Sequence, residues 1–314
     1  LNSQVTDLKK DGKCFNITSE SGNYQASYVI NAAGLYSDTI PRMLGMDEFT
    51  INPRKGEYIL MNKNQGHLSK GVIFQTPSAK GKGILVTRTY HGNLMLGSNA
   101  QEVQDKEAVG TGLEALEYIV NTARLSVKDF DIKYTLTSFA GLRASSSIHD
   151  FIVEESRVKG FINVAGIESP GITSSPAIAV YVADILKEAG LELEENKGFN
   201  PYRKPIIIPK DDDFDGAVDH EDPSKNIICR CEKVTEAEII DALNRGLTLD
   251  HVDGIKRRKR CTMGPCQGNF CTPRVTKIIA RELGIKEEDV TMRGKGSLNL
   301  PPRENRTFWR KLEK

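Results

Sequence analysis

The chain has 314 residues, of which 39% are hydrophobic and 27% are charged, so it is long enough to bury a sizeable core and to form two domains. Its 43 basic and 42 acidic residues leave a formal net charge of +1, which argues against nucleic acid as a partner of the whole surface. No apolar run reaches the roughly 18 residues of a membrane span, and Leu1-Asn-Ser-Gln lacks the basic-then-apolar order of a signal peptide. We therefore expect a cytoplasmic protein without a transmembrane segment, and attachment to the inner face of the membrane through a partner stays open.

The first 30 residues predict short strands, because apolar and β-branched residues flank turn-forming ones. The stretches Cys14-Phe-Asn-Ile-Thr and Tyr24-Gln-Ala-Ser-Tyr-Val-Ile are separated by the turn Glu20-Ser-Gly-Asn. Val29-Ile-Asn-Ala-Ala-Gly34 then reads as a strand that ends at glycine, and a helix is expected from Ser37 to Leu44. A strand end followed by a helix N-terminus directs backbone N–H groups outward, which suits an anion, although an ordinary strand-to-helix turn has the same pattern.

The segment Val29-Ile-Asn-Ala-Ala-Gly-Leu-Tyr-Ser-Asp38 resembles the second flavin-contacting segment of the D-amino-acid-oxidase-like FAD oxidoreductases. The resemblance implies that Ala33 and Gly34 contact FAD. Members of that family also carry a G-x-G-x-x-G turn for the FAD pyrophosphate, whereas Gly81-Lys-Gly83 lacks the third glycine and the helix that should follow it. We therefore expect an N-terminally shortened version of a longer protein, with a partial FAD-binding fold that does not bind FAD tightly by itself.

Residues 51–97 predict an antiparallel sheet. Strand-forming stretches separated by Gly, Asn and Lys turns begin at four positions: Ile51, Val72, Ile84 and Leu94. A helix from Leu113 to Arg124 places its apolar residues on one face, so it is expected to cover the sheet. A further strand runs from Tyr134 to Ala140 and leads to Gly141-Leu-Arg143.

Three segments of this region resemble the FAD-dependent glycerol-3-phosphate dehydrogenases, especially the anaerobic type, and are also similar to hydroxyglutarate and opine oxidases. They are Arg54-Lys-Gly-Glu-Tyr58, Thr89-Tyr-His-Gly-Asn-Leu-Met-Leu-Gly97 and Phe139-Ala-Gly-Leu-Arg143. The resemblance implies that Arg143 binds the substrate anion and that Tyr58 faces the substrate. A guanidinium fork suits a phosphate or a carboxylate, but a lone arginine also forms surface salt bridges, and Tyr58 could equally be a half-buried strand residue.

Residues 161–189 contain a second candidate flavin segment. Phe161-Ile-Asn-Val-Ala-Gly166 predicts a buried strand, and Pro176 suits the first turn of a helix that extends to about Ala189. The segment is similar to the C-terminal flavin-contacting segment of the same family, where a helix N-terminus meets the pyrimidine side of the isoalloxazine and stabilises negative charge on it. The resemblance implies five contacts, with plain helix capping as the alternative: Gly166, Ile167, Gly171, Thr173 and Ser174.

Residues 191–226 predict a linker, because this stretch is acidic and poor in aliphatic residues. Beyond it, Thr235-Glu-Ala-Glu238 is a capping-box pattern that opens a helix to about Arg245. Further helices are expected from Thr248 to about Arg257 and from Thr272 to Leu283.

Five of the six cysteines lie in this C-terminal part, as Cys229-Arg-Cys231 and Cys261-Thr-Met-Gly-Pro-Cys266-Gln-Gly-Asn-Phe-Cys271. Thiolates are soft ligands, and two such groups separated by helices can converge on zinc or on an iron–sulfur cluster. Buried inert cysteines or disulfides are the alternative, which the absence of a secretory signal disfavours. A one-residue gap is tight for two ligands of one zinc ion and easier for a two-iron cluster, so spacing helps only partly.

The residues around these cysteines resemble the bacterioferritin-associated-ferredoxin-like 2Fe-2S domain across roughly residues 227–285. The resemblance implies four ligands: Cys229, Cys231, Cys266 and Cys271. Cys261 stands where that family has a small residue and is the spare thiol, but it lies five positions from Cys266, as Cys271 does, and could compete with Cys271. The basic run Lys256-Arg-Arg-Lys-Arg260 is expected to balance the thiolate charge or to dock an acidic redox partner, rather than to bind nucleic acid.

The sequence therefore predicts an α+β chain: a partial FAD-binding fold with an antiparallel-sheet substrate domain, followed by a small helical 2Fe-2S domain. The expected parts are residues 1–190 for the flavin and substrate regions, 191–226 for the linker, and 227–314 for the cluster domain and tail. The resemblances imply oxidation of sn-glycerol 3-phosphate to dihydroxyacetone phosphate with FAD, and electrons leaving through the cluster to an acceptor protein or a quinone-linked partner. A 2-hydroxy acid or opine-type substrate, and a non-catalytic iron–sulfur or zinc module, are the alternatives.

Overall fold

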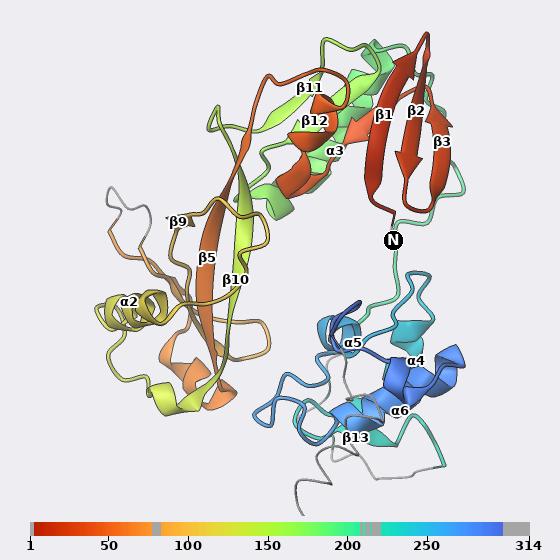
Figure 1. Ribbon diagram of the computed structural model, residues 1–314. Coiled ribbons are helices and arrows are strands. Elements are labelled where there is room, and N and C mark those ends of the chain that lie inside the picture. The colour runs from red at the N-terminus through yellow and green to blue at the C-terminus, as the bar shows by residue number, and fades with distance from the viewer. Residues whose placement is uncertain (1–2, 77–82, 208–209, 211–213, 215–220, 298–314) are drawn as a thin grey trace, which may run out of the picture. The chain divides into compact units, whose positions relative to one another are not determined.

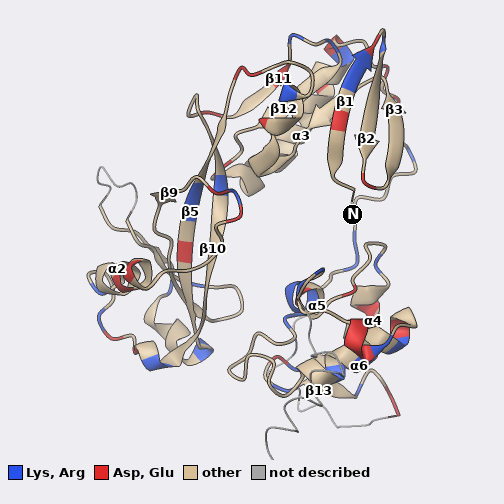
Figure 2. Cartoon of the chain, viewed as in Figure 1, with Lys and Arg blue, Asp and Glu red and all other residues tan. Residues whose placement is uncertain are grey.

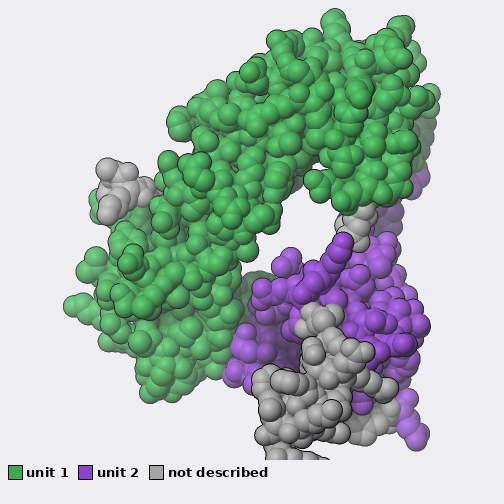
Figure 3. Space-filling view, in the orientation of Figure 1, with its two compact units in different colours: residues 1–197 green, residues 198–314 purple. Residues whose placement is uncertain are grey.

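The computed structural model describes residues 3–76, 83–207, 210, 214 and 221–297 (Figure 1). The chain forms two compact units, residues 1–197 and 198–314, which are coloured separately in Figure 3. The boundary between them falls inside the stretch that was predicted as a linker. Gly81, most of the acidic stretch at 211–220 and the tail after residue 297 lie outside the described residues.

Unit 1 begins with an antiparallel meander of three strands: β1 (Val5–Asp11), β2 (Cys14–Ser19) and β3 (Gly22–Ala26). Gly12 makes the first turn with a φ of 57°, a conformation that glycine adopts without strain. Leu8 and Phe15 are fully buried and pack with Met46 and Phe161. The meander is thereby fastened to the rest of unit 1 by an apolar core.

A second sheet has the order β11-β12-β4, from β11 (Ile152–Glu155), β12 (Phe161–Ala165) and β4 (Val29–Asn31). β12 pairs with β4 in parallel and with β11 in antiparallel orientation. α3 (Gly171–Glu188) packs on this sheet through Val182 and Ile185, which contact Ile162. The helix predicted from Ser37 is only one turn, α1 (Thr39–Arg42), after the 3-10 turn η1 (Gly34–Tyr36), because Gly45 with a φ of 73° ends it.

The third sheet of unit 1 is antiparallel, as predicted, and has the order β10-β5-β8-β7-β6, with β9 also paired to β5. Its strands are β5 (Ile51–Met61), β6 (Val72–Ile73), β7 (Val86–Arg88), β8 (Leu94–Gly97), β9 (Gln101–Glu102) and β10 (Thr135–Ser146). α2 (Leu113–Ala123) covers one face through Ile119 and Ala123, so the predicted covering helix is confirmed. The 3-10 turns η2 (Lys63–Leu68) and η3 (Ile132–Tyr134) complete this part.

Unit 2 is mainly helical. It contains β13 (Ile227–Cys229), β14 (Val234–Thr235), α4 (Glu236–Leu243), α5 (Val252–Lys259), α6 (Thr272–Leu283) and η4 (Glu287–Asp289). The predicted capping box is present, with Thr235 and Glu238 each bonding to the backbone of the other. Ile239, Ile255 and Val275 form the centre of its core, one from each helix. The predicted α+β class is confirmed, and no described helix is long and apolar enough to cross a membrane.

Asp38 ties the turn after β4 to the antiparallel sheet. Its side chain is 4% exposed, and its Oδ1 accepts a hydrogen bond from Lys106 Nζ at 2.6 Å. Its Oδ2 accepts from the backbone N–H of Ile51 at 3.2 Å and from Arg42 Nη2 at 3.3 Å. Burial raises the pKa of Asp38, but the bonds from Lys106 and Ile51 and the Arg42 charge outweigh burial and hold this pKa below its ordinary value.

We expect Asp38→Asn to lower the free energy of unfolding near pH 7 by about 1.5–3 kcal/mol, the range for a hydrogen bond to a charged group. Because the folded-state pKa of Asp38 is depressed, this stabilisation is present above the unfolded-state pKa of about 3.9 and is lost as the pH falls through the lower folded-state pKa. Urea unfolding at a series of pH values measures it, with the exposed Asp11→Asn as the control. A difference from wild type that stays constant down to pH 2 would contradict the assignment.

Candidate functional site

The ends of two parallel strands bring the predicted flavin segments together. β4 and β12 pair in parallel, Val29 with Phe161 and Asn31 with Asn163, so their carboxyl ends lie at one edge of the sheet. β4 leads to Ala33 and Gly34, which are exposed, and β12 leads to Gly166. Cofactors of α/β folds bind beyond the carboxyl ends of parallel strands, so this edge is a candidate flavin site.

Asn31 links the two strand ends. Its Nδ2 donates to the backbone oxygen of Ser37 at 2.7 Å and to Oδ1 of Asn163 at 2.9 Å. Among the residues that the structure describes, its own Oδ1 is buried and has no hydrogen-bond partner. An unpaired buried acceptor costs about 1–3 kcal/mol, so the strand edge is suited to a group that brings a donor.

An apolar cavity of about 450 Å³ lies between this edge and α3. Ile30 of β4 and Ala32 just after it line one side, and Gly171, Ile178 and Val182 line it from α3. Ile167, like Gly171 a predicted flavin residue, lines it from the loop between β12 and α3. Such walls suit a flat, largely apolar ring.

The start of α3 places the remaining predicted flavin residues. Gly171 packs so closely that an added Cβ would lie 2.6 Å from Cγ2 of Ile167. Thr173 is exposed in the first turn, and Ser174 is half-buried with its Oγ donating to the carbonyl of Pro170 at 3.2 Å. The helix begins without a side-chain cap, and its positive end suits an anionic or electron-rich group. The described residues therefore fit part of a flavin.

A second cavity, of about 330 Å³, adjoins Gly166 and the end of β10. Ser146, the last residue of β10, lines it, and an added Cβ on Gly166 would lie 2.8 Å from the Cβ of Ser146. Ser146 Oγ also donates to the carbonyl of Asp150 at 2.6 Å. The strand that carries Arg143 therefore ends against the loop of the candidate flavin site.

The register of β5 and β10 builds a substrate-sized face. Arg54 lies opposite Arg143, Gly56 opposite Gly141, and Tyr58 opposite Phe139. Opposite residues of an antiparallel pair project to the same side, and so do residues two positions apart, so all six belong to one face. In Figure 2 the basic segments of the two strands lie side by side.

The face between β5 and β10 has an aromatic end and a basic end. The rings of Tyr58 and Phe139 stack with centroids 5.1 Å apart and planes within 10°. Arg143 donates through Nη2 to Ser98 Oγ, and an added Cβ on Gly56 would lie 2.9 Å from Arg143 Nη2. The missing side chain of Gly56 therefore lets the guanidinium group of Arg143 and Ser98 lie against β5, whereas the space above Gly141 is open.

Arg54 and Arg143 are half-buried, and among the described residues neither forms an ion pair with a carboxylate. The exposed Glu102 of β9 lies opposite Arg54 on its other flank. On the opposite face of β5, the buried Glu57 is held by Lys55 at 2.8 Å. The face with two arginines thus offers guanidinium donors to an anion.

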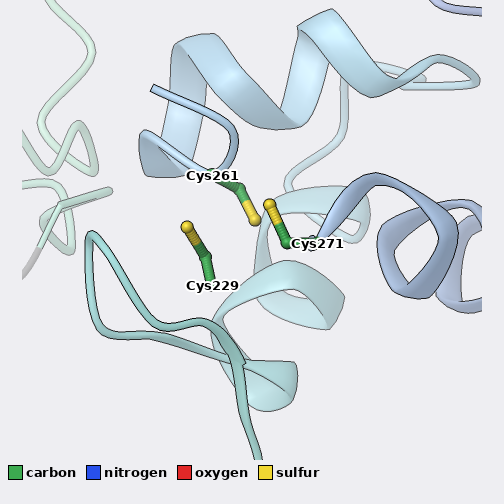
Figure 4. A group of neighbouring side chains, drawn as sticks. All are labelled: Cys229, Cys261 and Cys271. Carbon is green, nitrogen blue, oxygen red and sulfur yellow. The ribbon is translucent and has the colours of Figure 1, made fainter. Parts of the chain in front are cut away.

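The structure divides the C-terminal cysteines into two groups. The Sγ atoms of Cys229, Cys261 and Cys271 all lie within 4.8 Å of one another and are buried (Figure 4). Cys231 and Cys266 have their Sγ atoms 3.8 Å apart, and Cys231 is exposed. Of the four predicted ligands, Cys229 and Cys271 therefore belong to the buried group, and Cys231 and Cys266 form the other group. Cys261 is the third member of the buried group.

The distances favour two metal atoms over one. A tetrahedral centre with metal–sulfur bonds of ~2.3 Å separates its sulfurs by about 3.8 Å. Cys231 and Cys266 match this spacing, and the buried thiols Cys229, Cys261 and Cys271 offer ligands for a second metal. A lone zinc ion would leave one of the two groups unused, whereas a two-iron cluster uses both.

Hydrogen bonds stabilise negative charge in both groups. The thiols of Cys261 and Cys271 donate to Cys229 and hold its pKa far below the ordinary value. The same bonds, with burial, raise the pKa of Cys261 and of Cys271. Backbone N–H groups, first that of Phe270, lower the pKa of Cys266. Negative charge is therefore favoured on Cys229 in one group and on Cys266 in the other, which suits metal ligands.

Backbone turns bring the cysteine segments together. Arg260, with a φ of 62°, ends α5 in the left-handed conformation, and its Nε donates to Oε2 of Glu232 at 2.9 Å. Both side chains are nearly buried, with 12% and 6% exposed. An added Cβ on Gly264 would lie 2.1 Å from the Cβ of Cys231, so only glycine allows this approach.

The basic run at 256–260 is largely used inside unit 2. Lys259 is buried and its Nζ lies 2.9 Å from Oδ2 of Asp241, while Arg258 donates to the carbonyl of Ala242 at 2.7 Å. Arg260 is paired with Glu232. Lys259, Arg258 and Arg260 therefore stabilise the fold of unit 2, and the roles expected for the run, balancing the thiolate charge or docking an acidic redox partner, stay predictions.

Residues 1–185, more than half of the chain, match the family described as FAD dependent oxidoreductase. The chain belongs to this family. Residues 227–281 match the BFD-like [2Fe-2S] binding domain. The predictions of an oxidoreductase with FAD and a 2Fe-2S cluster as cofactors are confirmed by these two matches.

Several relatives share much of the sequence. The chain is 46% identical to a glycerol 3-phosphate dehydrogenase of Caloramator mitchellensis over 96% of this chain and 63% of that protein. A glycerol 3-phosphate oxidase of Mycoplasma genitalium is 30% identical, over 64% of this chain and 53% of that protein. The structure of L-alpha-glycerophosphate oxidase from Mycoplasma pneumoniae with FAD bound has a TM-score of 0.55 and 28% identity, over 59% of this chain and 50% of that chain. The chain thus spans between half and two thirds of the length of these relatives.

Two residues of the site were not singled out by the sequence. Arg54 was part of a quoted motif without a role, although Arg54-Lys-Gly-Glu-Tyr58 and Phe139-Ala-Gly-Leu-Arg143 mirror each other, which could have indicated an antiparallel pair. Asn31 carried no signal of its buried acceptor, because its partner Asn163 is 132 positions away.

Proposed function

We propose that the protein to which this chain belongs oxidises sn-glycerol 3-phosphate to dihydroxyacetone phosphate. One observation carries the choice of substrate: Arg54 and Arg143 lie opposite each other on one face of β5 and β10. Two guanidinium groups match the double negative charge of a phosphate monoester, whereas a single carboxylate needs only one. The names of the relatives from Caloramator mitchellensis and Mycoplasma genitalium, each for enzymes of glycerol 3-phosphate, support the same substrate.

The residues on this face have separate tasks. Arg54 and Arg143 bind the phosphate, and Gly141, which has no atom within 4 Å of an added Cβ, leaves room for the carbon chain beside them. The stacked rings of Tyr58 and Phe139 form an apolar wall at the other end of the face. The phosphate is thereby anchored at one end, and this orients the carbon that reacts.

FAD, when bound, accepts a hydride from the secondary alcohol carbon, and a 2Fe-2S cluster passes electrons on one at a time. The residues proposed to hold FAD are Ala33, Gly34, Gly166, Ile167, Gly171, Thr173 and Ser174. The residues proposed to hold the cluster are Cys229, Cys231, Cys266 and Cys271. Both sets lie on turns whose backbone N–H groups favour negative charge.

We expect Arg143→Met and Arg54→Met each to raise KM for glycerol 3-phosphate by roughly ten- to a hundredfold, because each removes a charge-assisted bond worth about 1.5–3 kcal/mol. Steady-state kinetics of the whole protein with an artificial acceptor measure this, and the exposed Arg88→Met on β7 is the control. In the same assay glycerol 3-phosphate should turn over faster than 2-hydroxyglutarate. Preference for 2-hydroxyglutarate, or an unchanged KM in both variants, would contradict the proposal.

The proposed electron outlet is the outward surface beside Cys231. The guanidinium groups of Arg230 and Arg274 each lie 4.7 Å from the ring centroid of Phe270, and Phe270 is 43% exposed. Arg230 stands between two of the proposed cluster ligands, and Phe270 precedes a third. A basic, aromatic surface next to an exposed thiol suits an acidic electron-acceptor protein.

We expect the double substitution Arg230→Glu with Arg274→Glu to slow electron transfer to an acidic acceptor such as a flavodoxin by about tenfold or more at low salt, because it reverses the charge of the surface. Stopped-flow measurements with the whole protein should also show that the wild-type rate falls as salt is added. Lys277→Glu, an exposed change on α6, is the matched control, and reduction of an uncharged dye should stay unchanged. Equal rates in wild type and the double variant would place the outlet elsewhere.

A further inference from the structure

The cluster site contains one thiol more than a 2Fe-2S cluster requires. Such a cluster takes four thiolates, two on each iron, whereas unit 2 holds five thiols, a buried group of three and the pair of Cys231 and Cys266. The other group, called the exposed group because Cys231 is exposed, contains only Cys231 and Cys266, at the spacing of two ligands on one metal. The surplus therefore lies in the buried group of Cys229, Cys261 and Cys271.

We propose that Cys261 and Cys271 are interchangeable ligands of the same iron, a proposal that rests on the assignment of a 2Fe-2S cluster to this site. Their Sγ atoms lie within 4.8 Å of each other and of Cys229, so either thiolate can complete a pair with Cys229. With a cluster bound, its iron would exchange the sulfur of Cys271 for that of Cys261, and the proton of the Cys261 thiol would go to Cys271. Atoms and charge balance, and no oxidant or reductant is needed.

The backbone holds Cys261 in place for this exchange. Its neighbours Arg260 and Thr262 both adopt the left-handed conformation, with φ of 62° and 74°, so the chain turns sharply on either side of it. The buried pair of Arg260 with Glu232 fastens this turn to the segment that carries Cys229. Cys261 itself is fully buried, and its Sγ points toward the other two sulfurs in Figure 4. The reserve thiol is therefore positioned without a rearrangement of the helices.

Helix geometry makes Cys271 the resting ligand. Cys271 occupies the N-cap of α6, a helix of 12 residues, where the positive helix end favours a thiolate. Cys261 follows the end of α5 and lacks that stabilisation. Cys271 is therefore the better ligand, and Cys261 takes its place where Cys271 is lost.

The exposed group has no such reserve. The sixth cysteine of the chain, Cys14, belongs to unit 1. Loss of Cys231 or Cys266 therefore leaves one iron with a single thiol ligand. The cluster should therefore survive loss of a cysteine in the buried group only. This difference distinguishes a ligand exchange from a general tolerance of cysteine loss.

Alanine variants of the full chain test the proposal, because alanine offers no ligand atom. Cys261→Ala and Cys271→Ala should each keep about two irons per chain, whereas the double variant and Cys231→Ala should lose the cluster. Iron and sulfide content, visible absorption and EPR of the reduced protein are the readouts, and far-UV circular dichroism reports folding. Cys271→Ser is the less disruptive second variant, and it should give the all-sulfur spectrum of the wild type because Cys261 replaces the serine oxygen.

The outcomes test the ligand exchange and the cluster site separately. A folded Cys271→Ala without iron, beside a wild type with its cluster, would overturn the exchange and leave the proposed cluster site intact. A double variant that keeps its cluster would also overturn the exchange. A wild-type chain that assembles no cluster would instead overturn the proposed site itself.

Discussion

The antiparallel ladder between β5 and β10 is the constraint on which unit 1 depends. It runs from Ile51 opposite Ser146 to Met61 opposite Thr135. At one end the N–H of Ile51 is bound by the buried Asp38, and Ser146 lies against the loop that carries Gly166. The ladder therefore joins the parallel strand ends to the face with two arginines. A slip of one residue would turn an arginine to the opposite face and remove the pair.

Unit 2 depends on a comparable constraint at smaller scale, the close approach of two cysteine segments. Gly264 allows contact with Cys231, and the buried pair of Arg260 with Glu232 fastens the two segments together. The pair leaves both charged side chains nearly buried, with 12% of Arg260 and 6% of Glu232 exposed. These contacts also place Cys261 at the cluster site as a fifth cysteine, although a 2Fe-2S cluster needs only four. Cluster assembly and the fold of unit 2 are thus coupled, as in other small metal-binding domains.

The sequence predicted the parts that depend on local patterns. Strand alternation identified the antiparallel sheet, the apolar face identified α2, and the Thr235 capping box identified the start of α4. It did not predict contacts set by distant register, such as Arg54 opposite Arg143, because pairing depends on strands far apart in the chain. It also left Cys261 as a spare thiol, because left-handed turns at non-glycine residues such as Thr262 have no local signature.

We propose that oxidation of glycerol 3-phosphate at the flavin site of unit 1 supplies the electrons that reduce the cluster of unit 2. Anaerobic addition of glycerol 3-phosphate to the whole protein, followed by low-temperature EPR, measures this transfer. We expect the signal of a reduced 2Fe-2S cluster with glycerol 3-phosphate and none with glycerol, which lacks the phosphate proposed to bind Arg54 and Arg143. A cluster that dithionite reduces but glycerol 3-phosphate does not would contradict it.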